Sequence, residues 1–153
     1  MLLDSIDKTI LRILQVDCSI ANVALADQVA LSPPACLKRV KRLVKEGIIS
    51  KRVALLDPSK LGSRLHIIVE VFMERDRREL NEQFMREVNH IPQIKECYQV
   101  NGDVDFILII EVLDLVSYEE IQNKLFFNNN NVKNFKTLVS MSRSKYETQL
   151  VIE

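Results

Sequence analysis

Five basic side chains share one face of a predicted helix near residue 40. They are Lys38, Arg39, Lys41, Arg42 and Lys45. With 100° between successive residues, this face also holds Pro34 and Ala35 but no acid, and the apolar residues fall on the other side. A helix face exposed only to water usually mixes both signs, because like charges four residues apart repel each other. An all-basic face is suited to binding nucleic-acid phosphates.

A second polar cluster lies between two apolar stretches further along the chain. It is the sequence Asn101-Gly102-Asp103-Val104-Asp105, the densest group of polar residues between predicted strands. This makes it the candidate site in the second half of the chain. A plain hairpin turn is the alternative, because Asn-Gly and its relatives favour tight turns.

No catalytic or metal-binding set accompanies these clusters. The histidines His66 and His90 are far apart, and no Ser/His/Asp spacing, P-loop or dinucleotide fingerprint is present. The cysteines Cys18, Cys36 and Cys97 are odd in number and scattered, which favours free structural thiols over disulfides or a metal site. We therefore expect no enzyme activity, metal or cofactor.

Two shorter helices are predicted before the basic one. The first begins at the capping residue Asp4, with Asp7 in its first turn, and the second begins at Asn22. Only residues 30–31 separate the second helix from Ser32, which caps the basic helix. A tight turn between two amphipathic helices is typical of a helix-turn-helix, which lays its second helix in the major groove.

The segment after Gly47 predicts a wing beside this helix-turn-helix. A short strand pair is indicated by Ile48, Ile49, Val53, Leu55 and Leu56. Lys51 and Arg52 on this wing are expected to contact phosphates. The predicted DNA contacts are Ser32, Pro34, Ala35, Lys38, Arg39, Arg42, Lys51 and Arg52. The alternative is a three-helix structural or protein-binding module with a solvated basic face.

Charge is distributed unevenly along the chain. The 21 basic and 21 acidic residues cancel overall, but residues 1–60 hold ten basic and six acidic residues, and residues 61–153 hold eleven and fifteen. This asymmetry predicts a polyanion-binding domain at 1–60, including a linker strand, and a different domain at 61–153. No apolar run is long enough for a membrane helix, and the first residues do not resemble a secretory signal, so we expect a cytoplasmic protein.

Residues 61–153 predict the element order βαββαβ. Strands are expected at 65–73, 94–100, 106–112 and 135–141, helices at 77–88 and from the cap Ser117 to the break at 128–131, and a further edge segment at 150–152. This order is the ferredoxin-like arrangement, an antiparallel sheet with both helices on one face. With the winged helix-turn-helix it gives an α+β fold. The bare face of so apolar a sheet should pair with a second copy, and such a homodimer would match a palindromic site in double-stranded DNA.

Five segments spread along the chain carry a family resemblance. They are IDKTILRIL, LADQVALS, SPPACLKRVKRLVKEGII, CYQVNGDVDFIL and VKNFKTLVSM. In this order and spacing, over essentially the whole length, they resemble the leucine-responsive regulatory protein and asparagine-regulator (Lrp/AsnC) family. The resemblance implies a nucleoid-associated transcription regulator that dimerises through its sheet, assembles into tetramers or octamers, and binds an amino-acid effector.

The resemblance also implies where the effector binds, which is between dimers near a Gly-x-x-Asp loop. Here the loop is 102–105, and Asp105 stands at the family's acidic effector position, where it would accept from an α-ammonium group. Backbone N–H groups around Asn101 would hold the carboxylate. The implied effector residues are Asn101, Gly102, Asp103, Asp105, Thr137, Leu138 and Ser140. Cys36 stands where the leucine-responsive branch often has cysteine, which favours an aliphatic amino acid.

Two departures from the family pattern stand out. Asn128–Asn131 replaces a short turn and would alter the contact between dimers, and a Gly-Arg pair common near Cys18 is missing, which would weaken one contact with the DNA backbone.

Two other functions fit the same fold. A ligand-free architectural protein would bind DNA with a steep salt dependence and little sequence preference. An enzyme like the sirohaem decarboxylases would need a haem-sized pocket with basic and histidine groups, whereas the basic residues here gather on the predicted recognition helix.

Overall fold

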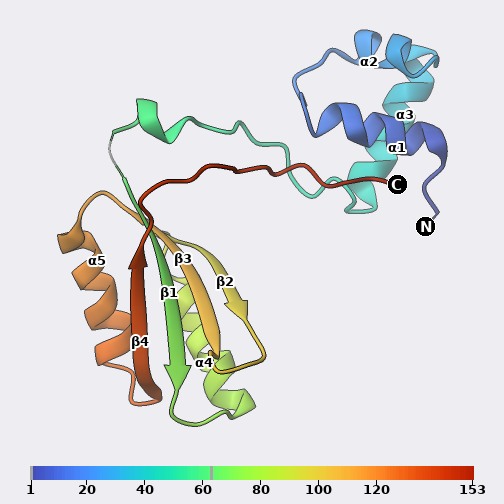
Figure 1. Ribbon diagram of the computed structural model, residues 1–153. Helices are drawn as coiled ribbons and strands as arrows, with labels where there is room; N and C mark the ends of the chain where they lie inside the picture. Colours follow the sequence, from blue (N-terminus) through green and yellow to red (C-terminus); the bar gives the residue numbers. More distant parts are fainter. Residues whose placement is uncertain (1, 63) are drawn as a thin grey trace. The chain divides into compact units, whose positions relative to one another are not determined.

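The computed structural model describes residues 2–62 and 64–153 and divides the chain into two compact units (Figure 1). The described residues up to Leu55 form the first unit together with Lys145–Glu153, and Leu56–Ser144 form the second. The predicted domains, 1–60 and 61–153, differ from these units in that Lys145–Glu153 lie in the first unit. Hydrogen bonds to the first helix, described below, hold these residues to the first unit.

Three helices form the first unit: α1 (Ser5–Leu14), α2 (Asn22–Gln28) and α3 (Pro33–Lys45). Their shared core consists of Ile10, Leu25, Ala26, Val29, Cys36, Val40 and Leu43. Between α2 and α3 the chain turns at Ala30, whose φ of 50° lies in the left-handed region, and the Leu31 N–H donates to the Ala26 carbonyl at 3.0 Å. This tight turn confirms the predicted helix-turn-helix.

The second unit is a four-stranded antiparallel sheet with two helical segments. Its elements are β1 (Leu65–Met73), α4 (Arg78–Asn89), β2 (Ile94–Gln99), β3 (Phe106–Val112), α5 (Leu115–Gln122) and β4 (Val132–Val139). A π-helical turn, η2 (Asn123–Phe127), extends α5. The strand order is β2-β3-β1-β4, and every neighbouring pair is antiparallel. The predicted ferredoxin-like βαββαβ arrangement is confirmed.

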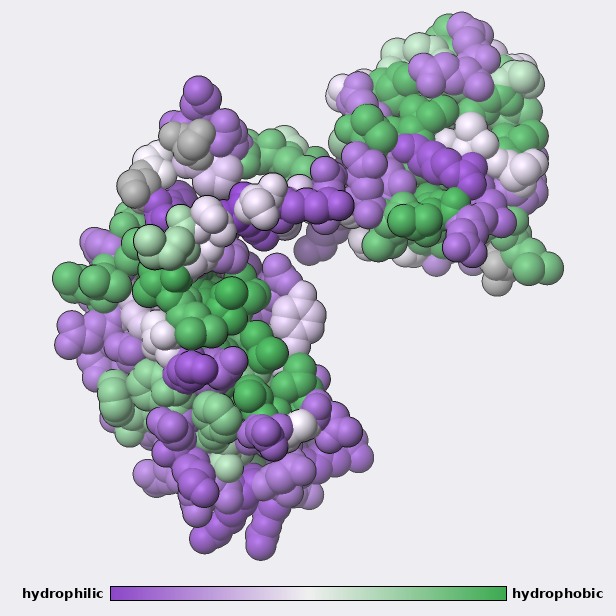
Figure 2. All heavy atoms as spheres, in the orientation of Figure 1, coloured by the Kyte–Doolittle hydropathy of each residue, from purple (hydrophilic) through white to green (hydrophobic). Residues whose placement is uncertain are grey.

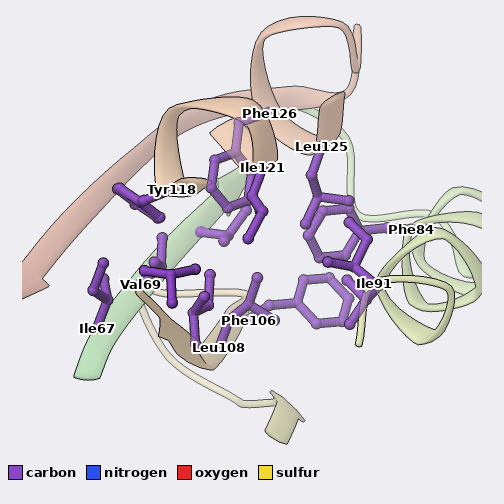
Figure 3. Close-up of a cluster of buried hydrophobic side chains, with 14 of the residues drawn as sticks. Ile67, Val69, Phe84, Ile91, Phe106, Leu108, Tyr118, Ile121, Leu125 and Phe126 are labelled. Atoms are coloured by element: carbon purple, nitrogen blue, oxygen red, sulfur yellow. The ribbon is translucent and has the colours of Figure 1, made fainter. Parts of the chain in front are cut away.

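One face of this sheet carries both helices and the core. Residues of β1 and β3 alternate between buried and partly exposed, so Val69 and Leu108, for example, point to the same side. Against this side pack Phe84 of α4 and Ile121 of α5, as Figure 3 shows. The ring of Phe84 lies 4.9 Å from that of Phe106, centroid to centroid. Period-two burial on two strands and period-3.6 burial on two helices thus meet in one core.

The opposite face of the sheet carries no helix and is largely apolar. Figure 2 shows hydrophobic side chains gathered over the strands on this side. The strand register places on it Ile68, Phe72, Ile107, Ile109 and Leu138. Leu138 is 39% exposed and Tyr98 is 50% exposed. Lys136 and Glu70 pair on the same face at 3.6 Å, so the apolar surface also carries charges.

Several predicted local features are wrong. The described residues between Gly47 and Pro58 contain no strand, and a 3₁₀ turn, η1 (Pro58–Lys60), follows them. Val53 and Leu56 are 62% and 70% exposed, and no strand among the residues described pairs with this segment. The segment 150–152 adds no edge strand. Helix α5 is capped by Asp114, whose carboxylate accepts from the Ser117 N–H at 2.8 Å, and not by Ser117.

Candidate DNA-binding helix and effector-binding end of the sheet

Helix α3 presents a basic face away from the core. Cys36, Val40 and Leu43 are buried against the other two helices, which places Lys38 on the far side. The exposed residues on this side are Pro34, Lys38, Lys41, Arg42 and Lys45. Leu37 and Val44, predicted to point inward, are instead 42% and 45% exposed. The buried stripe of α3 is therefore narrower than predicted and consists of Cys36, Val40 and Leu43.

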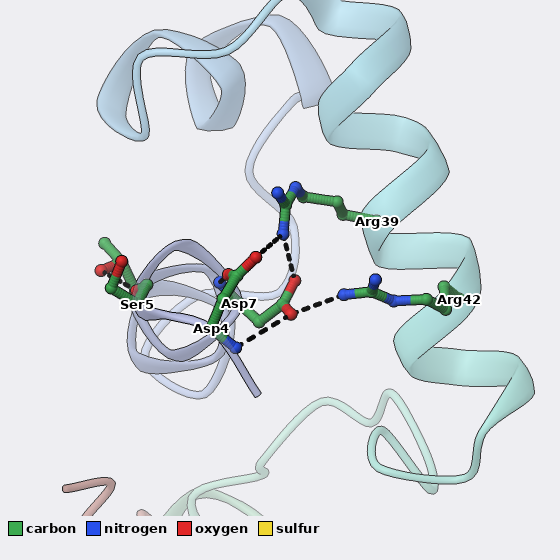
Figure 4. Close-up of polar contacts among 6 residues, drawn as sticks. Asp4, Ser5, Asp7, Arg39 and Arg42 are labelled. Carbon is green, nitrogen blue, oxygen red and sulfur yellow. Dashed lines mark hydrogen bonds and ion pairs between the residues drawn. The ribbon is translucent and has the colours of Figure 1, made fainter. Parts of the chain in front are cut away.

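A buried carboxylate on α1 fixes one edge of this basic face. Asp7 is 1% exposed, and it accepts from Arg39 Nη1 at 2.9 Å and from Arg42 Nη2 at 2.5 Å (Figure 4). Arg39 also pairs with Asp4 at 2.6 Å. Asp4 in turn caps α1, because its side chain accepts from the Asp7 N–H at 2.8 Å. The start of α1 is therefore tied to the middle of α3.

These contacts shift the ionisation of the exposed members. The hydrogen bond from the Asp7 N–H, followed by that from Arg39, lowers the pKa of Asp4 below its ordinary value. The hydrogen bonds to Asp4 and then to Asp7 raise the pKa of Arg39. Both pKa shifts favour the charged forms of Asp4 and Arg39.

The network divides the predicted DNA-contacting residues into two groups. Arg39 is held by two carboxylates with 26% of its side chain exposed, whereas Arg42 keeps 43% exposed and Lys38 points outward. The spacing carried a signal for this difference. Asp4 and Asp7 are three residues apart at the start of one helix, and Arg39 and Arg42 are three residues apart on another. This equal spacing allows the two pairs to form ion pairs, whereas helix capping alone explains only the position of the acids.

The other predicted DNA contacts lie at the two ends of α3. Ser32 and Pro34 are exposed at its start and Ala35 is partly buried. Asn22 does not cap α2; its amide donates to the Pro33 carbonyl at 2.8 Å and so ties the two helices together. Lys51 and Arg52 follow α3 in an irregular, exposed segment.

The predicted effector loop is an exposed turn between β2 and β3. Asn101, Gly102 and Asp103 are all exposed, and Gly102 has a φ of 145°. Asp105 is partly buried, and its Oδ2 accepts from the Met73 N–H at 2.7 Å. Among the residues that the structure describes, none donates to Asp105 Oδ1. Oδ2 therefore holds the end of β1, and Oδ1 is left available to accept a hydrogen bond from a ligand.

The asparagine segment 128–131 clamps the loop that leaves β1. The carbonyl of Asn131 accepts from the Glu74 N–H at 2.7 Å, and its side-chain amide bonds both the N–H and the carbonyl of Arg75, at 3.2 and 3.1 Å. Asn129 continues the network to Glu87 of α4 at 3.1 Å. The segment 128–131, which departs from the family pattern, thus fixes the backbone of Arg75, two residues after Met73, whose N–H donates to Asp105.

The remaining predicted effector residues lie elsewhere on the sheet. Thr137 is on the helix-covered face, where its hydroxyl contacts the Tyr118 hydroxyl at 2.6 Å, and Leu138 is on the opposite face. The Ser140 N–H donates to the His66 carbonyl at 2.8 Å, at the other end of β1 from Asp105. β1 separates β4 from β3, a gap of about 10 Å. One chain therefore does not bring these three residues to the loop.

Burial shifts the pKa values of two cysteines and one tyrosine. It raises the pKa of the Cys36 and Cys97 thiols, which disfavours the reactive thiolate. Burial likewise raises the pKa of Tyr118. No group of three or more potential metal ligands occurs within residues 2–62 and 64–153, and no helix in these ranges is long and apolar enough to cross a membrane.

The fold and these surfaces define a two-domain, DNA-binding regulator of transcription. A family model described as winged helix-turn-helix DNA-binding matches residues 3–50, and one described as Lrp/AsnC ligand binding domain matches residues 66–150. The chain therefore belongs to the Lrp/AsnC family of transcription regulators, which is a family of regulators and not of enzymes.

Individual relatives match over nearly the full length. The leucine-responsive regulatory protein of Escherichia coli is 38% identical over 151 residues, which cover 99% of this chain and 92% of that protein. An AsnC family regulator from Agrobacterium tumefaciens superposes with a TM-score of 0.89 at 32% identity, covering 97% of both chains. A regulator from Neisseria meningitidis, solved as a complex with L-Met, has the same TM-score at 28% identity, covering 98% of this chain and 97% of its own.

We expect Asp7→Asn to destabilise the first unit by about 1–3 kcal/mol, because the neutral amide removes the charge that pairs with Arg42 and leaves Arg39 paired with Asp4 alone. The cost stays below that of a fully buried pair, since both arginines are partly exposed. Urea unfolding followed by circular dichroism measures the change. Asp27→Asn, at an exposed position on α2, is the control and should change the free energy of unfolding by less than about 0.5 kcal/mol. Equal stability of Asp7→Asn and wild type would contradict this role.

Proposed function

We propose that this protein binds double-stranded DNA through α3 and changes that binding when an amino acid occupies the sheet domain. The observation that carries the DNA half is the outward face of α3, where Lys38, Lys41 and Lys45 are exposed with no acid between them. Arg42 flanks this face from the Asp7 network. Ser32, Pro34 and Ala35 at the start of the helix are small enough for close approach to base edges.

In this proposal Arg39 contributes mainly by holding α3 in place, with its outer edge available to a phosphate. Lys51 and Arg52 in the segment after α3 contact the backbone beside the groove. A protein with this role acts in the cytoplasm, at the nucleoid.

The effector half of the proposal rests on Asp105. Its Oδ1, to which no residue described by the structure donates, offers a carboxylate acceptor for an α-ammonium group, and the exposed turn Asn101-Gly102-Asp103 offers backbone donors for a carboxylate. The relative solved with L-Met supports an amino acid as the ligand. Methionine and leucine are both apolar and unbranched at Cβ, which agrees with the aliphatic preference suggested by Cys36.

The proposed effector site is completed by more than one chain. Thr137, Leu138 and Ser140 lie on a different strand end from the loop that contains Asp105, so their participation requires a second copy. The apolar, helix-free face of the sheet supplies a surface for a homodimer. Further assembly into a tetramer or octamer would place loops of neighbouring dimers together.

We expect Lys38→Ala to weaken DNA binding by a similar factor on all sequences and to lower the slope of log K against log salt by about one, because one phosphate contact is lost. Fluorescence anisotropy titrations at several salt concentrations measure both quantities. Lys124→Ala removes the same charge from an exposed position in the second unit and should leave both unchanged. An unchanged salt slope for Lys38→Ala would contradict a phosphate contact by Lys38.

A thermal-shift screen against the twenty amino acids tests the effector half. A ligand present at about 100 times its Kd should stabilise the protein by roughly 2.7 kcal/mol. Asp105→Asn should abolish the shift, since the amide oxygen still accepts from the Met73 N–H but the charge is gone. Glu119→Gln, exposed on α5, is the matched control. DNA binding without a response to any amino acid would instead favour the ligand-free architectural protein.

Light scattering tests the pairing of the sheets. We expect no species smaller than a dimer at micromolar concentration, because the apolar face of β1, β3 and β4 is otherwise left in water. Ile109→Glu, in the middle of that face, should shift the distribution toward monomer. A monodisperse wild-type monomer would refute the homodimer.

A further inference from the structure

The segment at the end of the chain docks on the DNA-binding unit as an extended peptide. Gln15, which ends α1, bonds Leu150 twice: its amide donates to the Leu150 carbonyl at 2.9 Å, and its carbonyl accepts from the Leu150 N–H at 2.9 Å. Arg12 donates to the Ile152 carbonyl through Nε and Nη2, at 3.2 and 2.6 Å. The side-chain amide of Gln15 thus makes the same pair of backbone hydrogen bonds to Leu150 that a neighbouring β-strand would make.

The docked segment lies over a groove of about 420 Å³ within the same unit. Apolar residues from both ends of the helical core line this groove, among them Leu3, Leu14 and Ile49. Ile152 also lines it, whereas the adjacent Val151 is 92% exposed. Alternate residues of the segment therefore face the groove and the solvent, as in peptides bound by strand addition.

The same groove includes Lys51 and Arg52, the proposed backbone contacts after α3. A docked segment 148–152 thus shares its surface with part of the proposed DNA-binding region. Its hydrogen bonds are all at exposed positions, and Leu150 is 75% exposed. Contacts of this kind are weak, and segments that move in regulation are drawn from such weakly held parts.

The chain passes between the two units twice, at residues 55–56 and at residues 144–145. The second passage follows β4, which ends at Val139 and carries Thr137 and Leu138, two residues of the proposed effector site. Only four residues separate Val139 from Ser144, the last residue of the second unit. The docked segment is therefore the shorter of two covalent routes from the proposed effector residues of β4 to the DNA-binding unit.

We propose that residues 148–152 act as a strap that transmits effector binding to the DNA-binding unit, with Gln15 and Arg12 as its positioning residues. The inference rests on the proposed function, because it assumes that an amino acid binds the sheet domain and alters DNA binding. In the docked state the strap fixes the segment that contains Lys51 and Arg52. Effector binding at β4 changes the strap's occupancy of the groove, and with it the DNA affinity.

Two adjacent substitutions in the full-length protein separate docking from a general effect on the segment. Ile152→Asp places a charge in the groove, whereas Val151→Asp places the same charge in solvent. Gln15→Ala removes both bonds to Leu150 from the other side. The measurement is the ratio of DNA Kd with and without the amino acid found in the thermal-shift screen, together with the thermal shift itself.

We expect wild type and Val151→Asp to show a ratio of roughly fivefold or more, a typical allosteric coupling. Ile152→Asp and Gln15→Ala should bring the ratio to within about twofold of one, while the thermal shift by the amino acid is unchanged. If Ile152→Asp and Gln15→Ala both kept the wild-type ratio of DNA Kd values, the proposal that the strap transmits effector binding would be wrong. A wild type that responds to no amino acid in either measurement would instead show that the proposed function has failed.

Hydrogen exchange tests the docked state without reference to any effector. The Leu150 amide should exchange roughly tenfold faster in Gln15→Ala than in wild type, because its acceptor is lost. Equal exchange rates in the two proteins would mean that the segment does not dock in solution, and this too would overturn the strap.

Discussion

The DNA-binding unit depends on one buried charge. A carboxylate that is 1% exposed, as in Asp7, is stable only when it is paired and hydrogen-bonded, and both partners come from α3. This requirement fixes the start of α1 against the middle of α3. With Arg39 held inward, the direction of the remaining basic side chains follows from helix geometry, and Lys38 and its neighbours point away from the core.

The sheet domain follows a different constraint. Each strand of an antiparallel sheet has two faces, and this unit has helices for only one of them. Residues such as Val69 and Leu108 are buried against the helices, whereas Ile68 and Ile109 lie on the helix-free face, which we propose to pair with a second copy. The proposed effector residues are divided in the same way between strand ends and faces. In our proposal, a second copy covers the apolar surface and completes the effector site.

The sequence predicted the elements whose patterns are local and periodic. All three N-terminal helices and the βαββαβ order follow from apolar spacing, tight turns and strand-like runs such as 106–112. The strand pair at 48–56 and the edge segment at 150–152 were predicted from composition alone, and neither has a partner strand. The pairing of Asp7 with Arg39 and Arg42 joins residues more than thirty positions apart, so a single sequence shows only the charges and not their contact.

The strengths of these contacts limit how a bound effector can alter DNA binding. Allosteric coupling free energies are typically about 1–3 kcal/mol. Separating α3 from α1 would lose the Asp7 ion pairs and also expose core side chains such as Ile10 and Leu43, each of which contributes about 1.5–3 kcal/mol when buried. An effector therefore lacks the free energy to separate α3 from α1 at Asp7. The hydrogen bonds that Gln15 and Arg12 make to the end of the chain are exposed and individually weaker. An allosteric response of this size therefore leaves the helix-turn-helix intact. It acts instead on the weaker contacts that tie the end of the chain to the DNA-binding unit.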